Sequence, residues 1–406
     1  MIFSSPVSFV NARVVARTGI ADSLRFRSSV LGIGDRPRRG DLVFDLEGAV
    51  VLPGLVNAHD HLELNHYGRL KCRDAYGNVS EWIRDMSPRL SSDAAIVSAR
   101  ALPLAERLFI GALKNLLAGV TSVGHHNPYY PELRRAMPIR VVRRYGWAHS
   151  FYLQHQAAGA RGEPGGDVAG RWRATPSDAP FIVHLGEGVD AEAGCEFARL
   201  EALGCLAANT VLVHGVAIDG REWPRAARRG AGLVWCPASN DFLFGRTADV
   251  RQALNGDGER RARVALATDS RLTGSRDLLD ELRAGRAFGC ASADELLAMV
   301  TSDAAALLRQ PRSGSIAVSQ PADLTVIPPL AATPASSLLE TTRRNVRLVV
   351  VDGKPLVGDP AFAPVFRARR ASARRGSVDA APKLIEAGLA RRIAGCPIAE
   401  PGVAVA

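Results

Sequence analysis

Residues 53–63 read PGLVNAHDHLE, an apolar run that ends in two histidines separated by a single residue. Alternate side chains on a strand point to the same face, so His59 and His61 are expected to face one centre. Further along, FIVHLGE contains His184, TVLVHGV contains His214 and RVALATDS contains Asp269, each at the end of an apolar run. Because the C-terminal ends of parallel strands converge on one mouth of a barrel, these five side chains are predicted to meet.

Nitrogen and oxygen donors of this kind suit a borderline cation, so we expect one divalent metal ion, zinc first and iron as the alternative. A single histidine at a strand end is more often a hydrogen-bonded polar residue than a ligand. The closely spaced pair, followed in order by two further strand-end histidines and an aspartate, argues against that interpretation. The sequence therefore predicts a metal centre.

The segment 53–312 is expected to form the barrel that carries this centre. Apolar strand-like runs alternate there with helical stretches such as 93–119 and 276–288, and this alternation predicts a parallel sheet with α/β architecture. Seven good strand candidates are visible, and the Gly- and Pro-rich stretch 151–179 shows no clear period.

The two ends of the chain are rich in short β segments. Residues 1–52 and 313–358 are expected to pair as a small β-sandwich, with Asp352-Gly353 as a hairpin turn. The tail, 359–406, is rich in Arg and Ala and has a helix candidate at 382–395. We assign it no role.

Composition limits the partners and the compartment. The net charge is +10, but the cations are nearly all Arg and no basic stripe is interleaved with aromatic residues, so no nucleic-acid partner is expected. The six cysteines are scattered, which argues against a disulfide framework and fits a reducing compartment. The chain has no signal-peptide layout at its start and no apolar run of about 18 residues. We expect a cytoplasmic protein without a membrane partner.

The chain resembles the amidohydrolase superfamily, and within it the deaminase and chlorohydrolase branch. The resemblance covers about residues 5–358 and rests on PGLVNAHDHLE (53–63), AGVTSVGHH (118–126), HLGEG (184–188), VLVHG (211–215), WCPASN (235–240), ATDSRLTGSRDLLDELR (267–283), IAVSQPADLTVI (316–327) and VVVDGKPLV (349–357). It implies a distorted (β/α)8 barrel of the TIM type with a sandwich made from both chain ends. It also implies that His59, His61, His184 and Asp269 bind the metal, while His214 ligates or lies just outside, and it is compatible with a homodimer.

Two features indicate which branch of this superfamily the chain resembles. Binuclear members bridge their metals with a modified lysine on a middle strand, and none of Lys71, Lys114, Lys354 or Lys383 is expected there. His184 is followed three residues later by Glu187, which resembles the deaminase branch, where this glutamate shuttles protons.

The chemistry that such a site needs assigns the remaining roles. A bound metal lowers the pKa of water toward about 7, and a carboxylate must then take and return protons. Asp269 can receive the proton of the water, and Glu187 can protonate a ring nitrogen and then the departing amine. His214 completes the predicted catalytic set. Solvated acids are also common in loops at strand ends, which is the alternative for Glu187.

Further polar residues near the strand ends are candidates for contact with a small-molecule substrate. They are His66, Arg73, His125, His126 and Ser270, for which packing and surface roles are the alternatives. Ser239 and Asn240 are interpreted as mainly structural. Asp60 departs from the deaminase pattern, which often has Thr between the two histidines.

We therefore expect a metal-dependent hydrolase of a carbon–nitrogen bond other than a peptide bond, acting by hydrolytic deamination of a cyclic amidine or aminated heterocycle. Ring opening of a cyclic amide or imide, and removal of chloride or another leaving group, remain open on the same metal site. A non-catalytic zinc-binding or nucleic-acid-binding protein is the alternative from another class. It predicts salt-dependent binding to DNA or RNA and no effect of Glu187→Gln.

Overall fold

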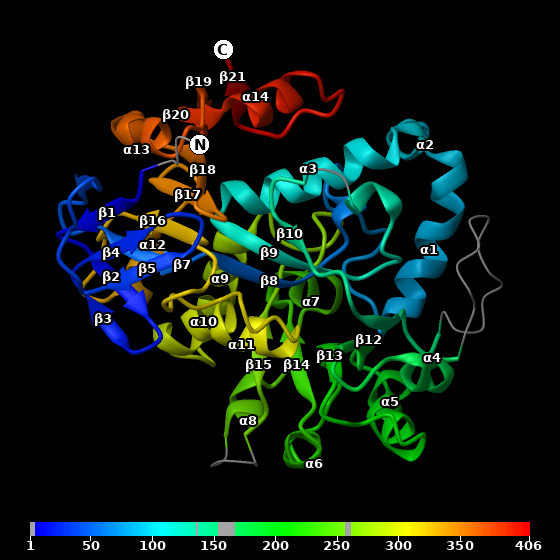
Figure 1. Ribbon diagram of the computed structural model, residues 1–406. Coiled ribbons are helices and arrows are strands. Elements are labelled where there is room, and N and C mark those ends of the chain that lie inside the picture. The colour runs from blue at the N-terminus through cyan, green and yellow to red at the C-terminus, as the bar shows by residue number, and fades with distance from the viewer. Residues whose placement is uncertain (1–4, 135–136, 153–166, 256–260) are drawn as a thin grey trace.

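The computed structural model describes residues 5–134, 137–152, 167–255 and 261–406. Figure 1 shows central strands surrounded by helices, with strands from both chain ends gathered beside them. The architecture is the expected α/β barrel fold, in a distorted form.

The central strands form two sheets in which all neighbours run parallel. The strand order is β10-β9-β8 in one sheet and β11-β12-β13-β14-β15 in the other. Their bounds are β8 (Leu55–Asp60), β9 (Val120–His125), β10 (Arg140–Val141), β11 (Gly146–Ala148), β12 (Phe181–Leu185), β13 (Thr210–His214), β14 (Gly232–Trp235) and β15 (Val264–Leu266).

The segment 139–149 contributes strands to both sheets. β10 pairs with β9, and four residues later β11 pairs with β12, so the chain switches neighbours between residues 141 and 146. This switch explains why only seven strand candidates are visible in the sequence. Of the irregular stretch 151–179, residues 153–166 lie outside the described part of the chain, and the helix α4 (Val168–Ala174) precedes β12.

A side chain joins the two sheets on their other side. Asn57 of β8 accepts a hydrogen bond from the backbone N–H of Thr268 at 3.2 Å and donates to its hydroxyl at 2.8 Å. Thr268 lies two residues after the end of β15 and directly precedes Asp269. The Asn57 side chain therefore replaces the backbone hydrogen bonds that join the other neighbouring strands. It fixes β8, which carries His59, against the turn that contains Asp269.

Helices cover the outside of the central strands (Figure 1). They are α1 (Val79–Ser92), α2 (Ala94–Ala101), α3 (Leu104–Leu117), α4, α5 (Ala191–Ala202), α6 (Trp223–Arg228), α7 (Pro237–Phe244), α8 (Val250–Leu254), α9 (Leu278–Ala287), α10 (Ala293–Met299) and α11 (Ser302–Leu307), with short 3-10 turns η1 (Leu62–Leu64) and η2 (Pro131–Arg134).

The helical stretch 93–119 is interrupted once. Leu102 has an extended conformation (φ −62, ψ 140) and separates α2 from α3. Its successor is Pro103, and a proline disfavours helical geometry in the residue before it, which accounts for the break. By contrast, the stretch 276–288 forms the single helix α9.

Strands from both chain ends form two further sheets. A four-stranded sheet has the order β5-β4-β1-β6, and a nine-stranded sheet has the order β21-β19-β20-β18-β17-β16-β7-β2-β3. The strands are β1 (Val7–Val10), β2 (Arg13–Ala16), β3 (Gly19–Ala21), β4 (Leu24–Phe26), β5 (Val30–Ile33), β6 (Leu42–Asp45), β7 (Val50–Pro53), β16 (Leu324–Ile327), β17 (Leu348–Val351), β18 (Lys354–Gly358), β19 (Ala373–Val378), β20 (Ala381–Glu386) and β21 (Val403–Val405).

Antiparallel pairing of β7 with β16 connects the two chain ends, with Val51 opposite Val326. A second apolar core, separate from that of the barrel, contains Phe9, Phe26 and Leu324. At the turn between β17 and β18, Asp352 and Gly353 both have positive φ (49° and 71°), as a two-residue hairpin of this type requires. Helix α12 (Pro334–Glu340) lies between β16 and β17 in the chain.

The tail is ordered and continues the large sheet. It contains η5 (Pro360–Phe362), α13 (Ala363–Ala368), β19, β20, α14 (Ala387–Ala394) and β21. The helix candidate 382–395 is half strand and half helix, because β20 pairs with both β18 and β19 before α14 begins. The buried carboxylate of Glu400 accepts two hydrogen bonds from Arg271, at 2.6 and 2.8 Å, and another from Arg343. The tail thus fixes the position of Arg271, which lies two residues after Asp269.

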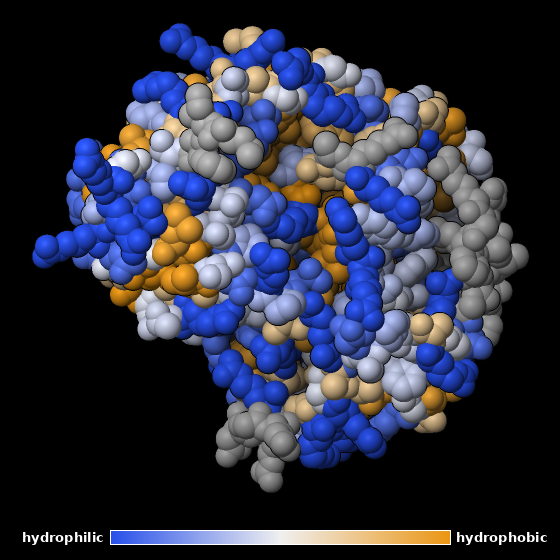
Figure 2. Space-filling model, in the orientation of Figure 1, coloured by the Kyte–Doolittle hydropathy of each residue, from blue (hydrophilic) through white to orange (hydrophobic). Residues whose placement is uncertain are grey.

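The face shown in Figure 2 is largely hydrophilic, and its hydrophilic residues do not gather in one stripe. Among the described residues, no helix is long and apolar enough to cross a membrane.

Candidate metal centre and active site

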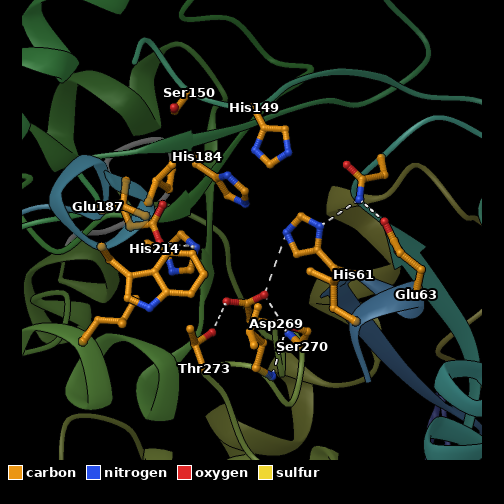
Figure 3. Close-up of a pocket in the computed structure, with 17 residues that line it drawn as sticks. His61, Glu63, His149, Ser150, His184, Glu187, His214, Asp269, Ser270 and Thr273 are labelled. Atoms are coloured by element: carbon orange, nitrogen blue, oxygen red, sulfur yellow. Dashed lines mark hydrogen bonds and ion pairs between the residues drawn. The ribbon is translucent and has the colours of Figure 1, made fainter. Parts of the chain in front are cut away.

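The predicted donors lie where their strands end. His59 belongs to β8 and His61 follows it, His184 and His214 lie at the ends of β12 and β13, and Asp269 follows β15. His214 and Asp269 have positive φ values of 75° and 51°. Non-glycine residues rarely adopt this conformation, and such strain concentrates at functional sites. Figure 3 shows His61, His184, His214 and Asp269 around one cavity.

The distances between donor atoms fit a bound cation. The Nε2 atoms of His59 and His184 are 3.3 Å apart, and Asp269 Oδ1 lies 3.8 Å from His61 Nε2 and 4.0 Å from His59 Nε2. With metal–nitrogen distances of 2.0–2.1 Å, two ligands of a tetrahedral zinc ion are separated by about 3.3 Å. Burial lowers the pKa of both His59 and His184 well below the ordinary value, so both imidazoles are neutral, as ligation requires.

Hydrogen bonds hold the Asp269 carboxylate in place. Oδ2 accepts from Ser239 Oγ at 2.9 Å and from Thr273 Oγ1 at 2.8 Å, and Oδ1 accepts from the N–H of Ser270 at 2.6 Å. Burial raises the pKa of Asp269, but the neighbouring His61 and His214 and these hydroxyl groups outweigh burial and lower the pKa below its ordinary value. The group is ionised and directed at the histidines.

His214 lies beside the His184 ring, with centroids 5.1 Å apart, and also faces Glu187. Its Nδ1 lies 2.9 Å from the Oδ1 atom of Asn240, which can only accept, so Nδ1 carries the proton and Nε2 has a free lone pair. That Nε2 is 3.4 Å from Glu187 Oε1. Asn240, expected to be mainly structural, thereby selects the tautomer of His214.

Glu187 is a buried acid at the wall of the cavity, with 7% of its surface exposed. Burial, followed by repulsion from Asp269 and Glu196, raises the pKa of its carboxyl well above the ordinary value. Two carboxyl groups thus face one cavity, with Asp269 ionised and Glu187 protonated. Such a pair is suited to acid–base chemistry.

Glu196 of α5 holds the loop that carries Glu187, because it accepts a hydrogen bond from the N–H of Gly186 at 2.7 Å. Burial raises the pKa of Glu196 to about 7 from 4.5. The folded chain therefore binds a proton more tightly than the unfolded chain, and stability falls as the pH rises through this window.

We predict that the free energy of unfolding falls when the pH is raised from 4.5 to 7, and that it falls by about 2 kcal/mol more in wild type than in Glu196→Gln. This value is reduced to allow for the partial solvent exposure of Glu196. Denaturant titrations of both proteins across this range provide the test. Parallel stability curves would contradict the assignment.

Two further histidines lie among the predicted donors. His126, expected to contact substrate, is fully buried, and one ring nitrogen from each of His59, His61, His126 and His184 lies within 4.8 Å of the others. His149 was not predicted as a site residue. It follows β11, and its ring stacks against that of His61 with centroids 5.9 Å apart. Burial lowers the pKa of His149 to about 3.

The other candidate substrate contacts differ in position. Ser270 lines the cavity. His66, Arg73, His125 and His126 are not among its lining residues. His66 bonds the carbonyl of Ala99, and Arg73 is half-exposed and pairs with Asp85 at 2.6 Å. The structure therefore gives Arg73 a surface ion pair and offers no support for its binding substrate.

A buried polar network lies beneath the HxH pair. Asp60 Oδ2 is 3.0 Å from Lys114 Nζ and accepts from Asn115 Nδ2 at 2.8 Å, while Asp60 Oδ1 accepts from Asn65 at 2.7 Å. Lys114 also donates to Thr268 Oγ1 at 3.1 Å. Asp60 and Lys114 are both fully buried. The network joins β8 and α3 to the residue before Asp269.

The metal centre opens into a cavity of about 220 Å³, lined by polar site residues on one side and by Val79, Trp82, Ile83, Leu243 and Leu272 on the other. A second cavity of about 320 Å³ shares the lining residues Leu64, Trp82, Ile83, His149 and Leu272 with the first. It runs along α1 and α2 and includes Met86, Leu90 and Ile96. The second cavity is more apolar than the first.

The fold and this donor set define a metal-dependent hydrolase of the barrel class. The model of the amidohydrolase family matches residues 178–356. The chain is 28% identical over 405 residues to the 5-methylthioadenosine/S-adenosylhomocysteine deaminase of Halobacterium salinarum, which covers 87% of this chain and 92% of the relative. The chain is similar to the amidohydrolases and is a metal-dependent hydrolase of carbon–nitrogen bonds.

Two solved structures are similar in fold. An atrazine chlorohydrolase of Arthrobacter aurescens, complexed with zinc, has a TM-score of 0.68 at 18% identity, covering 89% of this chain and 100% of that one. An adenosine deaminase from Xanthomonas campestris with bound zinc has a TM-score of 0.65 at 18% identity, covering 90% and 97%.

Proposed function

We propose that this chain hydrolyses the bond between a heterocyclic ring carbon and its amino group, with water supplying the oxygen of the product and ammonia leaving. The observation that carries this proposal is the placement of Asp269 and Glu187, two carboxyl groups whose pKa values shift in opposite directions, on one cavity beside a buried imidazole cluster. Deaminases named for adenosine derivatives among the relatives support it.

The donors His59, His61, His184 and Asp269 would hold one zinc ion. When bound, the ion supplies Lewis acidity, which makes a water molecule acidic enough to act as a nucleophile near neutral pH. The site's neutral imidazoles and fixed carboxylate suit zinc better than magnesium or calcium, which prefer oxygen donors.

The protons then pass through residues of this chain. The Asp269 carboxylate takes a proton from the attacking water, because its oxygens face the imidazoles that would hold the metal. Glu187 donates its proton to the ring nitrogen next to the attacked carbon. The proton held by Asp269 then passes to the departing amine, and the hydroxyl proton returns to Glu187 as the carbonyl forms. His214 Nε2 lies 3.4 Å from Glu187 Oε1 and so positions the Glu187 carboxyl.

An ammonia-release screen with metal-loaded protein tests this function. The panel contains 5′-methylthioadenosine, S-adenosylhomocysteine, 5′-deoxyadenosine, aminotriazines, pterins, and cyclic amides and imides. We expect one ammonia per molecule of keto product from at least one amino heterocycle. Ring-opened products without ammonia would replace the proposal with cyclic amide hydrolysis, and release of chloride from chlorotriazines alone would replace it with dechlorination.

The second cavity favours a substrate that carries an apolar arm next to its ring. We predict that Ser87→Trp, on the exposed part of α1 that lines this cavity, lowers kcat/KM about 10–100-fold for S-adenosylhomocysteine and leaves 5′-deoxyadenosine within a few-fold. Arg84→Trp, exposed on the same helix outside the lining, is the control. Equal losses for both substrates would show that the arm does not bind there.

A further inference from the structure

His126 is a fully buried histidine with one ring nitrogen that has no protein partner. It follows β9 directly, and its Nε2 lies 2.9 Å from the carbonyl oxygen of Ala148. A carbonyl only accepts, so Nε2 carries the ring proton and Nδ1 has the free lone pair. Among the described residues, Nδ1 has no hydrogen-bond partner. A buried, unpaired acceptor is unfavourable unless something outside the chain satisfies it.

The His126 ring lies among the rings of the candidate metal donors. Its ring centroid lies 4.2 Å from that of His184, 4.9 Å from that of His59 and 5.5 Å from that of His61. One nitrogen from each of these four rings falls within 4.8 Å of the others. His61 and His184 line the cavity in Figure 3, whereas His126 lies outside its lining.

The hydrogen bond to Ala148 is the kind that metal-binding histidines make. Such a histidine usually donates its second ring N–H to a carbonyl or carboxylate, which fixes the ring and its tautomer. His214 also has one bonded and one free ring nitrogen, but its free nitrogen faces a carboxyl group. Its Nδ1 is bonded to Asn240, and its free Nε2 faces the Glu187 carboxyl at 3.4 Å.

We propose that His126 Nδ1 is a ligand of the metal ion, which is thereby held by the four imidazoles of His59, His61, His126 and His184, and that His214 is not a ligand. Asp269 then adds a carboxylate whose second oxygen stays bonded to Ser239 and Thr273. This inference depends on the metal centre but not on the deamination reaction.

Zinc affinity of His126→Asn, His214→Asn and wild type, measured by competition with a chromogenic chelator, separates the two histidines. We expect His126→Asn to lower the affinity by at least about 100-fold, more than the loss of a hydrogen-bonding neighbour causes. We expect His214→Asn to stay within a few-fold of wild type in affinity while losing turnover. Cobalt-substituted protein is expected to change its visible absorption spectrum in the first variant and not in the second.

A His126→Asn variant with wild-type zinc affinity and an unchanged cobalt spectrum would overturn the assignment. If that variant does not fold, X-ray absorption at the zinc edge decides with His214→Asn and wild type alone. Four imidazole ligands in both proteins support His126, and a reduced number in His214→Asn assigns the ligand role to His214 instead. Neither measurement requires a substrate, so an absence of ammonia release does not affect them.

Discussion

Replacing Glu187 with glutamine is expected to lower kcat by about 10²–10⁴-fold while the metal stays bound. The Glu187 carboxyl is buried against His214, and burial and the charge of Asp269 raise its pKa, so it holds the proton that the substrate ring needs. Glutamine keeps the size and the hydrogen bonds of the side chain but cannot release that proton. Turnover and metal content are measured on the same preparation.

Glu192→Gln is the matched control, because Glu192 lies exposed at the start of α5, a few residues further along. Its turnover is expected to stay within about two-fold of wild type. A Glu187→Gln enzyme with more than about a tenth of wild-type kcat would remove Glu187 from the proton path. Loss of the metal from Glu187→Gln would assign it a structural role instead.

Replacing Lys114 with methionine is expected to lower the free energy of unfolding by about 3–5 kcal/mol, because Asp60 would keep a buried charge without its partner. Burial lowers the pKa of Lys114, but the nearby Asp60 carboxylate opposes this and favours the charged form. Denaturant unfolding of the purified variant gives the change directly. Asp60 lies between His59 and His61, so we also expect weaker metal binding.

The double variant Asp60→Asn/Lys114→Met separates pairing from packing. It is expected to recover part of the loss, since no buried charge is left unpaired. Lys354→Met is the surface control, because Lys354 is half-exposed and pairs with Glu386 at 3.0 Å, and its cost is expected to be at most about 1 kcal/mol. Equal costs for Lys114→Met and Lys354→Met would show that the buried pair does not stabilise the barrel.

The metal donors could be predicted because their signal is local. Each stands at the end of an apolar run, and strand ends in a barrel share one mouth, so His59, His61, His184 and Asp269 follow from the sequence. His149 meets the same criterion, since it ends the stretch 139–149. The switch of that stretch from β9 to β12 hides its register, which depends on strand pairing rather than on the local sequence.

The pair His125-His126 shows a limit of local reasoning. Neighbouring residues on a strand point to opposite faces, but the sequence does not say which of the two faces the centre. In the structure a ring nitrogen of His126 lies within 4.8 Å of those of His59, His61 and His184, while His125 Nδ1 is 3.9 Å from Glu63. The burial of Lys114 against Asp60 is similarly hidden, because residues distant in the sequence form the network.

The tail shows the same limit for the fold. Its Arg- and Ala-rich composition carries no clear period, and its strands exist because β20 pairs with β18, a contact that only the folded sheet supplies. The departure at Asp60 acquires a reason only in three dimensions, where the carboxylate balances a buried lysine.

The metal content of the purified wild-type chain, determined after exhaustive dialysis together with turnover, tests the metal centre itself. We predict about one divalent ion per chain, whose removal by a chelator abolishes ammonia release and whose return restores it. A chain that turns over substrate with no stoichiometric metal, or that binds none when zinc is supplied, would contradict a catalytic ion held by the barrel-mouth histidines.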